Sequence, residues 1–256
     1  MIPMSISITT LTDTNIEKEH ICCAISDVKC RAGYNAKKRW LQDQFRDGYK
    51  FKKVEVRGKA FIEYVPAENA WVPLVAPGYL LINCFWVSGQ HKGKGYGKAL
   101  YLECENEAKM EGKNGIVVVT GNSKQAYMSD RRFFQNQGFE LCDTAQPYFE
   151  LWYKSLNENI WKPEFRDCCK TGECDVKEGL AVYYTDACPF TGYYTEELER
   201  MACEKGYKIS KIKLESREMA QNHFSPHTIY SLFQDGKFLT HQILNEKSFE
   251  KLLGGG

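Results

Sequence analysis

The sequence predicts a mixed α/β fold in two parts, a larger domain built on a mixed sheet and a second, smaller α/β domain. Strand-like and helical runs alternate through residues 51–153, as in a layered α/β architecture. A glycine-rich turn in this region leads directly from a buried strand-like run into a helical one. Periodicity fades over residues 157–178 and then restarts. We therefore expect domains at residues 1–156 and 179–256, joined by a linker at 157–178.

Two helices are expected in the first segment, residues 5–48. Asp13 or Thr14 can cap the first helix, and Glu17 is placed for a capping box. Its apolar positions would be Cys22, Cys23, Ile25 and Val28. The second helix is expected at residues 36–45, because Gly48 supplies a C-terminal stop soon after it.

Strand patterns follow. Residues 51–56 alternate weakly and end in the turn signal Arg57-Gly58-Lys59. Residues 79–87 are almost continuously apolar, as a strand buried on both faces should be. The other strands expected in the first domain occupy residues 60–65, 71–75, 116–120, 139–141 and 149–153.

Helices in the first domain follow turns. The glycine-rich turn at residues 88–97 opens into a helix at 98–109, where apolar residues recur at helical spacing. A later helix at 129–137 is stopped by Gly138.

The second domain starts with a strand at 180–184, a helix at 192–205 and a strand at 207–214. Asp235-Gly236 is a strong hairpin signal between strands at 228–233 and 238–242. With a closing helix at 246–253, the order β-α-β-β-β-α, or a near variant, indicates a small thioredoxin-like domain.

Composition excludes several function classes. Lys and Arg number 34 against 33 Asp and Glu, so the net charge of +1 favours neither nucleic acid nor an anionic membrane. The local cluster Lys37-Lys38-Arg39 is interpreted as a solvated helix face. No apolar run approaches the ~20 residues that span a bilayer, and residues 1–12 lack the regions of a signal peptide. A cytoplasmic location with 11 reduced cysteines is expected; the oligomeric state is not predicted.

The glycine-rich turn has the chemistry of a pyrophosphate site. Glycines let backbone N–H groups approach a phosphate, and a following helix N-terminus adds partial positive charge. Ala99 follows Gly97-Lys98 where a Walker A loop needs Ser or Thr, and a Rossmann turn would follow the first strand. Both of those alternatives are therefore rejected.

The segment from Val87 to Leu100 resembles motif A of the GNAT acetyltransferases, a strand followed by Arg/Gln-x-x-Gly-x-Gly/Ala and a helix. Lys92 stands where this family usually has Arg or Gln. The segment from Phe133 to Phe139 resembles the family's later Tyr-x-x-x-Gly-Phe signature, and the similarity spans residues 5–153. Residues 19–27, 85–88 and 224–238 resemble, more narrowly, the YoaP-like subgroup of this family. That subgroup joins a GNAT domain to a small C-terminal domain.

The resemblance implies an N-acetyltransferase that uses acetyl-CoA as co-substrate and acetylates a primary amine of a small molecule or peptide by direct attack. The strand end would bind the pantetheine arm and polarise the thioester carbonyl, and the turn would bind the pyrophosphate. The cofactor-binding residues implied are Phe85, Trp86, Val87, Lys92, Gly93, Lys94, Gly95, Tyr96, Gly97, Lys98 and Asn122. The acceptor pocket is expected in loops 33–48 and 66–77.

Acetyl transfer needs a donor for the departing thiolate and a base for the amine. Many relatives use the Tyr of the later signature as donor, but Phe134 stands there and cannot donate. Tyr127 is the candidate donor, with Ser129 nearby; a surface or capping role is open for both. Glu63 is the candidate base because it lies opposite in face to its apolar neighbour Ile62, although an exposed strand carboxylate fits equally.

Relatives often carry a carboxylate on the strand expected at residues 79–87, at the positions that Asn83 and Cys84 occupy here. Cys84 has no identifiable His partner, so a buried strand cysteine is the better interpretation. His20 is a remote alternative as base.

The second domain places Cys188 before a helix, in a segment that resembles the glutaredoxin site with its second cysteine replaced by Thr191. A helix N-terminus lowers a thiol pKa, so Cys188 could be reactive, or the fold could have lost redox activity. No metal site is predicted from Cys168, Cys169 and Cys174, because they lack a Cys-x-x-Cys spacing and a fourth ligand; a solvated linker is preferred. The alternative function is a catalytically weak CoA-binding protein with a thiol-based redox or metal-sensing role.

Overall fold

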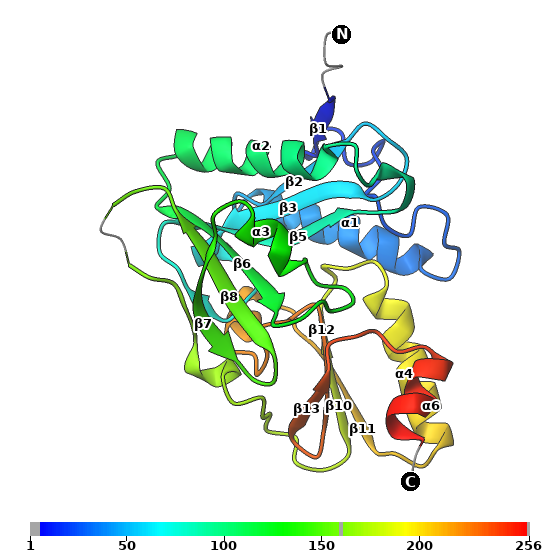
Figure 1. Ribbon diagram of the computed structural model, residues 1–256. Helices are drawn as coiled ribbons and strands as arrows, with labels where there is room; N and C mark the ends of the chain where they lie inside the picture. Colours follow the sequence, from blue (N-terminus) through cyan, green and yellow to red (C-terminus); the bar gives the residue numbers. More distant parts are fainter. Residues whose placement is uncertain (1–5, 159–160, 255–256) are drawn as a thin grey trace.

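The computed structural model describes residues 6–158 and 161–254, so the parts of the predictions that fall on residues 1–5, 159–160 and 255–256 lie outside it. Its larger sheet has the strand order β1-β2-β3-β5-β6-β8-β7, and only β5 and β6 run parallel (Figure 1). Its strands are β1 (Ile8–Thr10), β2 (Lys50–Val54), β3 (Ala60–Pro66), β5 (Tyr79–Val87), β6 (Gly115–Gly121), β7 (Glu140–Ala145) and β8 (Phe149–Ser155).

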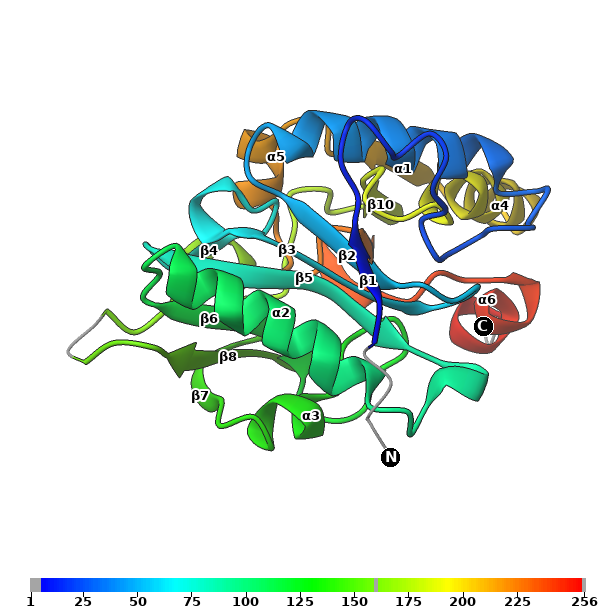
Figure 2. The ribbon, with the colours of Figure 1, turned by 90° about the horizontal axis from the view of Figure 1, so that it is seen from above.

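Helices cover both faces of this mixed sheet. Helices α2 (Tyr96–Met110) and α3 (Arg131–Gln135) lie on one face; α1 (Arg31–Phe45) and the second sheet lie on the other (Figures 1 and 2). Successive side chains of β3 point to opposite faces of the sheet and so pack into the apolar cores on both faces. Ile62 packs with residues of α2, while Phe61 packs with residues of α1. Glu63 therefore faces the second sheet, opposite to Ile62 as predicted.

The smaller sheet has the order β11-β10-β12-β13, with β10 (Leu180–Tyr184) parallel to β11 (Ile209–Lys213). Strands β12 (Tyr230–Gln234) and β13 (Lys237–Thr240) are antiparallel and meet at the predicted Asp235-Gly236 turn. The helices are α4 (Thr191–Glu204), α5 (Arg217–Gln221) and α6 (Glu246–Leu253). The predicted order lacked only the short α5, and the thioredoxin-like classification stays a prediction.

One predicted helix is wrong. Residues 13–18 form turns rather than a helix. Cys22 and Ala24 then take φ values of +63° and +53°, which an α-helix of L-residues does not accommodate. The helix that does form runs from Arg31 to Phe45, and Gly48 with φ +83° follows its end as expected.

Residues 161–178, between the two sheets, pack against both parts of the structure, so the interpretation of the cysteine cluster as a solvated linker is wrong. Strand β9 (Glu164–Phe165) pairs with β4 (Leu74–Val75) of the larger part. Cys169 and Cys174 are buried, with 0% and 1% of their surface exposed, because they belong to two different apolar cores. Their burial in separate cores leaves the linker thiols no common solvated face.

The two parts are docked through close packing and polar bonds. Helices α1 and α4 lie side by side (Figure 2), and a Cβ atom at Gly33 would meet the carbonyl oxygen of Pro189 at 2.2 Å. Arg217 of α5 pairs with Asp47, which follows α1. Within residues 6–158 and 161–254, no helix is long and apolar enough to span a membrane.

Candidate active site

Two neighbouring strands separate at the centre of the larger sheet. Strands β5 and β6 pair only from Tyr79 to Ile82. Beyond that point β5 stays with β3 as far as Val87, while β6 stays with β8 as far as Gly121. A bulge at Asn83, opposite Glu63 and Tyr64, turns the end of β5 away. The divergence opens a wedge whose facing strand edges are not used for pairing, so they can bind an extended ligand.

The glycine-rich turn lies at the end of this wedge. Gly93 and Gly95 have φ values of +75° and +78°, and Gly95 is the N-cap of α2. A Cβ atom at either position would meet nothing within 4 Å, so the left-handed backbone and not crowding requires glycine. The first turn of α2 carries no acidic residue, and Lys92, Lys94 and Lys98 are exposed around it. This arrangement fits a diphosphate group.

A cavity of about 310 Å³ lies between the larger sheet and the second domain; we call it the interdomain cavity. Phe61, Glu63 and Trp86 line it from the larger sheet, and Cys188, His227 and Ile243 line it from the second domain. A smaller space of about 50 Å³ opens beside it, where β5 and β6 separate. Both spaces are lined by Cys84, Trp86, Tyr127, His227 and Ile229, which we call the junction.

Glu63 is the carboxylate of this site. It is 3% exposed, and its Oε2 accepts hydrogen bonds from Lys37 Nζ at 2.6 Å and from the Tyr49 hydroxyl at 2.5 Å. Asn83 Nδ2 in turn donates to the Tyr49 oxygen at 2.9 Å. Burial, followed by the charge of Glu63, raises the pKa of Tyr49 well above its usual range, so this hydroxyl stays protonated and donates. Glu63 is thus a buried, cavity-lining group, not an exposed strand carboxylate.

Lys37 corrects the interpretation of the basic cluster. Lys37 is 2% exposed and Lys38 is 9% exposed, so only Arg39 of the cluster lies on a solvated helix face. Lys38 donates to the carbonyl of Glu17, and the Lys37 ammonium lies 4.7 Å from the ring centre of Trp40 as well as on Glu63. The buried partner of Lys37 is 26 residues away on β3, so helix periodicity alone could not reveal it.

Tyr127 lies at the junction, as a candidate donor should. Its φ of +62° is unusual for a tyrosine, and the residue lines both spaces while it is 53% exposed. Burial, and then proximity to Cys188, raises the pKa of its hydroxyl, which therefore stays protonated. Phe134, in contrast, is completely buried against Phe85 and Phe139, within the core under α2.

Asn122 lies away from the junction. It is exposed after β6, and its backbone N–H donates to the carbonyl of Tyr148 at 2.8 Å. It lines neither space. Trp86 lines both, and its indole N–H is buried without a recorded partner in the described part of the chain. The assignment of Asn122 to the cofactor stays a prediction.

The thiols of the site are not activated. Cys188 precedes α4, but burial raises the pKa of its thiol, against the lowering expected at a helix N-terminus. Burial also raises the pKa of Cys84 well above its usual range, in agreement with a structural strand cysteine. In residues 6–158 and 161–254, no group of three or more His, Cys, Asp or Glu side chains is arranged to bind a metal ion.

Similar proteins place this site in a family. Residues 20–139 match the profile of the acetyltransferase (GNAT) family, and residues 209–251 match the YoaP-like profile. The chain is 41% identical over 243 residues to a Bacillus subtilis (strain 168) protein named "Uncharacterized N-acetyltransferase YoaP". That alignment covers 95% of this chain and 96% of the relative.

Solved structures with a similar arrangement include two acetyltransferases. One is an acetyltransferase of the GNAT family from Staphylococcus aureus Mu50, with a TM-score of 0.43 and 14% identity over 60% of this chain and 100% of that chain. The other is the PaiA N-acetyltransferase from Thermoplasma acidophilum in complex with coenzyme A, with a TM-score of 0.42 and 18% identity over 59% of this chain and 99% of that chain.

Proposed function

The chain belongs to the YoaP-like GNAT acetyltransferases, and from this membership we propose that it transfers acetyl from acetyl-CoA to a primary amine in the interdomain cavity. GNAT enzymes act on amine acceptors. The observation that carries the proposal is the wedge between β5 and β6, which leads from the glycine turn to the junction.

The residues of the wedge fit the parts of acetyl-CoA. Residues 83–87 of β5 lack a β6 partner, so their backbone is available to the pantetheine arm and to the thioester carbonyl. The N–H groups at the start of α2, with Lys92, Lys94 and Lys98 around them, suit the pyrophosphate. The thioester would then lie at the junction, against Trp86 and Tyr127.

The polar residues suggest how protons move. The amine lone pair attacks the thioester carbon, an N–C bond forms, and the C–S bond breaks. Glu63 would receive the proton that the amine loses, directly or through water, and the Tyr127 hydroxyl would donate to the departing thiolate. Oε2 of Glu63 already accepts hydrogen bonds from Lys37 and Tyr49, so Oε1 is the atom we assign to the proton.

Two further parts of the proposal concern organisation. We place the acetyltransferase domain at residues 1–156 and a YoaP-like, thioredoxin-like domain at 179–256, since β8 ends at Ser155 and β10 begins at Leu180. A cytoplasmic location is supported by the eleven cysteines, all of them free thiols. The raised pKa of Cys188 gives no support to a redox role, and we do not propose one.

Acetyl-CoA binding to Gly95→Glu tests the site. A carboxylate at this position would face the pyrophosphate, and we expect calorimetry to show at least about a hundredfold weaker binding. Gly206→Glu is the matched control, because Gly206 also has φ +78° and nothing within 4 Å, but lies after α4. Both variants should lose similar stability from backbone strain, about 1–2 kcal/mol.

The comparison between these variants decides the proposal. Folded wild type that does not bind acetyl-CoA would refute it. Equal binding by Gly95→Glu and Gly206→Glu would refute the position of the pyrophosphate.

A further inference from the structure

We infer that the second domain forms one wall of the acceptor site, and that the acceptor is a small monoamine with an apolar body whose amino group is held by His227. This inference rests on the proposed acetyl transfer and adds the class of acceptor. It assigns to the YoaP-like domain a direct part in substrate selection.

The composition of the interdomain cavity supports a shared site. Nearly half of its lining residues belong to the second domain, and most of the lining is apolar. Phe61 and Trp86 line it from the sheet, and Phe190 and Ile243 line it from the second domain. With a volume of about 310 Å³, the cavity is at the lower end of the range for small-molecule sites. It suits a compact apolar body.

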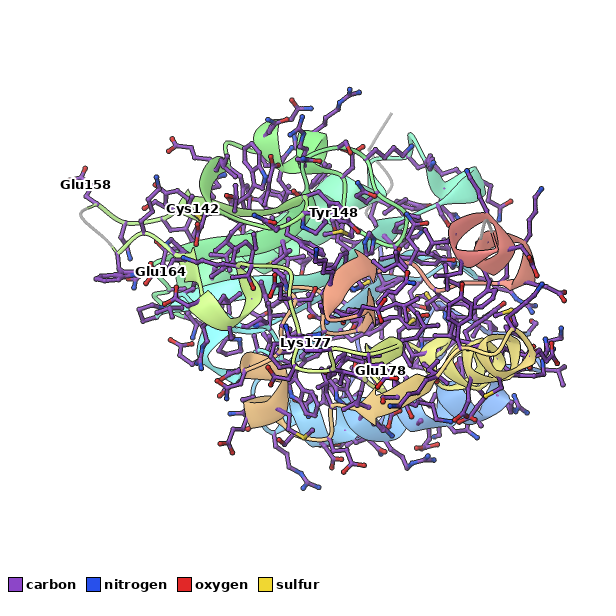
Figure 3. All side chains as sticks on the ribbon, turned by 90° about the horizontal axis from the view of Figure 1, so that it is seen from below. Cys142, Tyr148, Glu158, Glu164, Lys177 and Glu178 are labelled. Atoms are coloured by element: carbon purple, nitrogen blue, oxygen red, sulfur yellow. The ribbon has the colours of Figure 1, made fainter. Side chains whose placement is uncertain are left out.

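The wall is held in place by polar bonds between the domains. His241 Nε2 contacts the carbonyl of Ala126 at 2.7 Å, and its Nδ1 contacts the hydroxyl of Tyr148 at 2.7 Å. Tyr148, labelled in Figure 3, precedes β8 and faces β13 through its contact with Phe238. Because a carbonyl only accepts, His241 Nε2 must donate, and Nδ1 then accepts from Tyr148. The site is therefore pre-formed.

His227 presents a fixed acceptor atom at the junction. Its Nδ1 lies 3.0 Å from the carbonyl oxygen of Tyr230, so Nδ1 carries the proton and Nε2 carries the lone pair. Burial lowers the pKa of His227 to about 3, and of His241 below its usual range, so both rings are neutral. The described residues contain no recorded hydrogen-bond partner for His227 Nε2, and the ring lines both spaces.

An amine fits this acceptor atom. One N–H of a neutral primary amine can donate to Nε2 of His227, which orients the nitrogen lone pair toward the thioester in the adjoining space. His227 does not take the proton in this scheme, because a ring with so low a pKa is a weak base. It is a positioning contact, and Glu63 remains the proposed base.

The charges in the lining select against polyamines. Glu63 is its one acidic residue, and Oε2 of that carboxylate is already paired with Lys37. Lys59 also lines the cavity, 5.7 Å from the Phe190 ring centre, with no ion pair recorded among the described residues. Two lysines against one glutamate leave one positive charge. A second ammonium on the acceptor would be repelled, whereas an apolar body is accommodated.

Steady-state CoA release with 2-phenylethylamine, spermine and acetyl-CoA tests the inference in the full chain. The wild type should acetylate 2-phenylethylamine and prefer it to spermine. His227→Leu removes the acceptor atom and should lower kcat/KM for 2-phenylethylamine about tenfold. His227→Gln keeps a side-chain oxygen as acceptor and should retain most of the activity. Both variants should still bind acetyl-CoA, because the glycine turn that receives the pyrophosphate is unaltered.

A second pair of variants tests the wall. Ile243→Trp fills part of the cavity from a loop of the second domain, and kcat/KM should fall at least about tenfold. Leu252→Trp makes the same kind of enlargement at an exposed position of α6 and should have no effect.

Three results would overturn the inference. These are a preference for spermine, no turnover of 2-phenylethylamine by an enzyme that binds acetyl-CoA, and unchanged kinetics in His227→Leu and Ile243→Trp. Failure of the wild type to bind acetyl-CoA would instead refute the proposed function.

Discussion

Removing the charge of Lys37 should cost about 3 kcal/mol of folding free energy. The pair with Glu63 is short, at 2.6 Å, and its side chains are 2% and 4% exposed, so solvent screens it little. Lys37→Met keeps a side chain of similar length but removes the ammonium, which leaves the Tyr49 hydroxyl as the one other donor to the Glu63 carboxylate among the described residues. An uncompensated buried carboxylate is the source of the predicted loss.

The double variant Lys37→Met/Glu63→Gln separates charge from packing. The two neutral side chains are similar in volume to the lysine and glutamate that they replace, and the amide oxygen can still accept from Tyr49. We therefore expect the double variant to lose about 1 kcal/mol of folding free energy. Glu63→Gln alone leaves an unpaired ammonium and should cost about as much as Lys37→Met. The double-mutant cycle should therefore show a coupling energy above about 2 kcal/mol.

Equilibrium urea unfolding at pH 7 measures the change in unfolding free energy for each variant, provided that the m-value stays constant. Lys177→Met is the control, because the Lys177–Glu173 pair is 62% and 56% exposed and should contribute less than about 1 kcal/mol. If Lys37→Met loses under 1 kcal/mol, or if the single losses simply add in the double variant, the pair is not a desolvated one and the reasoning fails.

Two more predictions concern the second domain. Burial lowers the pKa of His223 to about 3, so its unfolded form gains a proton below pH 6.5 and the folded form does not. The free energy of unfolding therefore falls as the pH falls, by about 2 kcal/mol at pH 5. Urea unfolding at pH 7 and pH 5 should show that His223→Gln removes this loss. An unchanged pH dependence in the variant would contradict the prediction. Gly33→Ala should cost about 1–3 kcal/mol, because its Cβ meets Pro189 across the domain contact. Gly192→Ala, in α4 with nothing within 4 Å, should instead stabilise by about 0.5–1 kcal/mol, and equal melting temperatures for these two variants would refute the close approach.

Local patterns were sufficient for most of the sheet. Residues 79–87 were predicted as a buried strand and are β5, since a continuous apolar run leaves few alternatives. The hairpin at Asp235-Gly236 formed as predicted because both residues adopt positive φ. The helix expected near residues 13–28 does not form, although its apolar spacing is helical, because Cys22 and Ala24 adopt left-handed conformations. Strand β1 is three residues long and depends on pairing with β2.

The site was harder to predict than the fold, because its polar groups come together only through tertiary contacts. Glu63 and Tyr127 were selected as candidates, and both line the cavity. Lys37 is predicted from the sequence to be exposed, because a basic cluster on a helix usually is. Its burial depends on a partner on β3, Glu63, which helix periodicity does not reveal. His227 was missed altogether. Its tautomer depends on a carbonyl three residues later, and its place at the junction depends on how the two domains dock.

The docking of the domains also explains how the site can differ from the family pattern. The family's tyrosine position holds Phe134, which is sealed in an aromatic core by Phe85 and Phe139. A phenylalanine there has no hydroxyl to donate. The phenol that does reach the junction, Tyr127, sits in a loop that the second domain contacts, since His241 bonds to the carbonyl of Ala126. A bond to the preceding residue restrains this loop, and no side chain in the described part of the chain is bonded to the Tyr127 hydroxyl. If Tyr127 is the donor, then the second domain supplies both a wall of the acceptor site and the support of the acid.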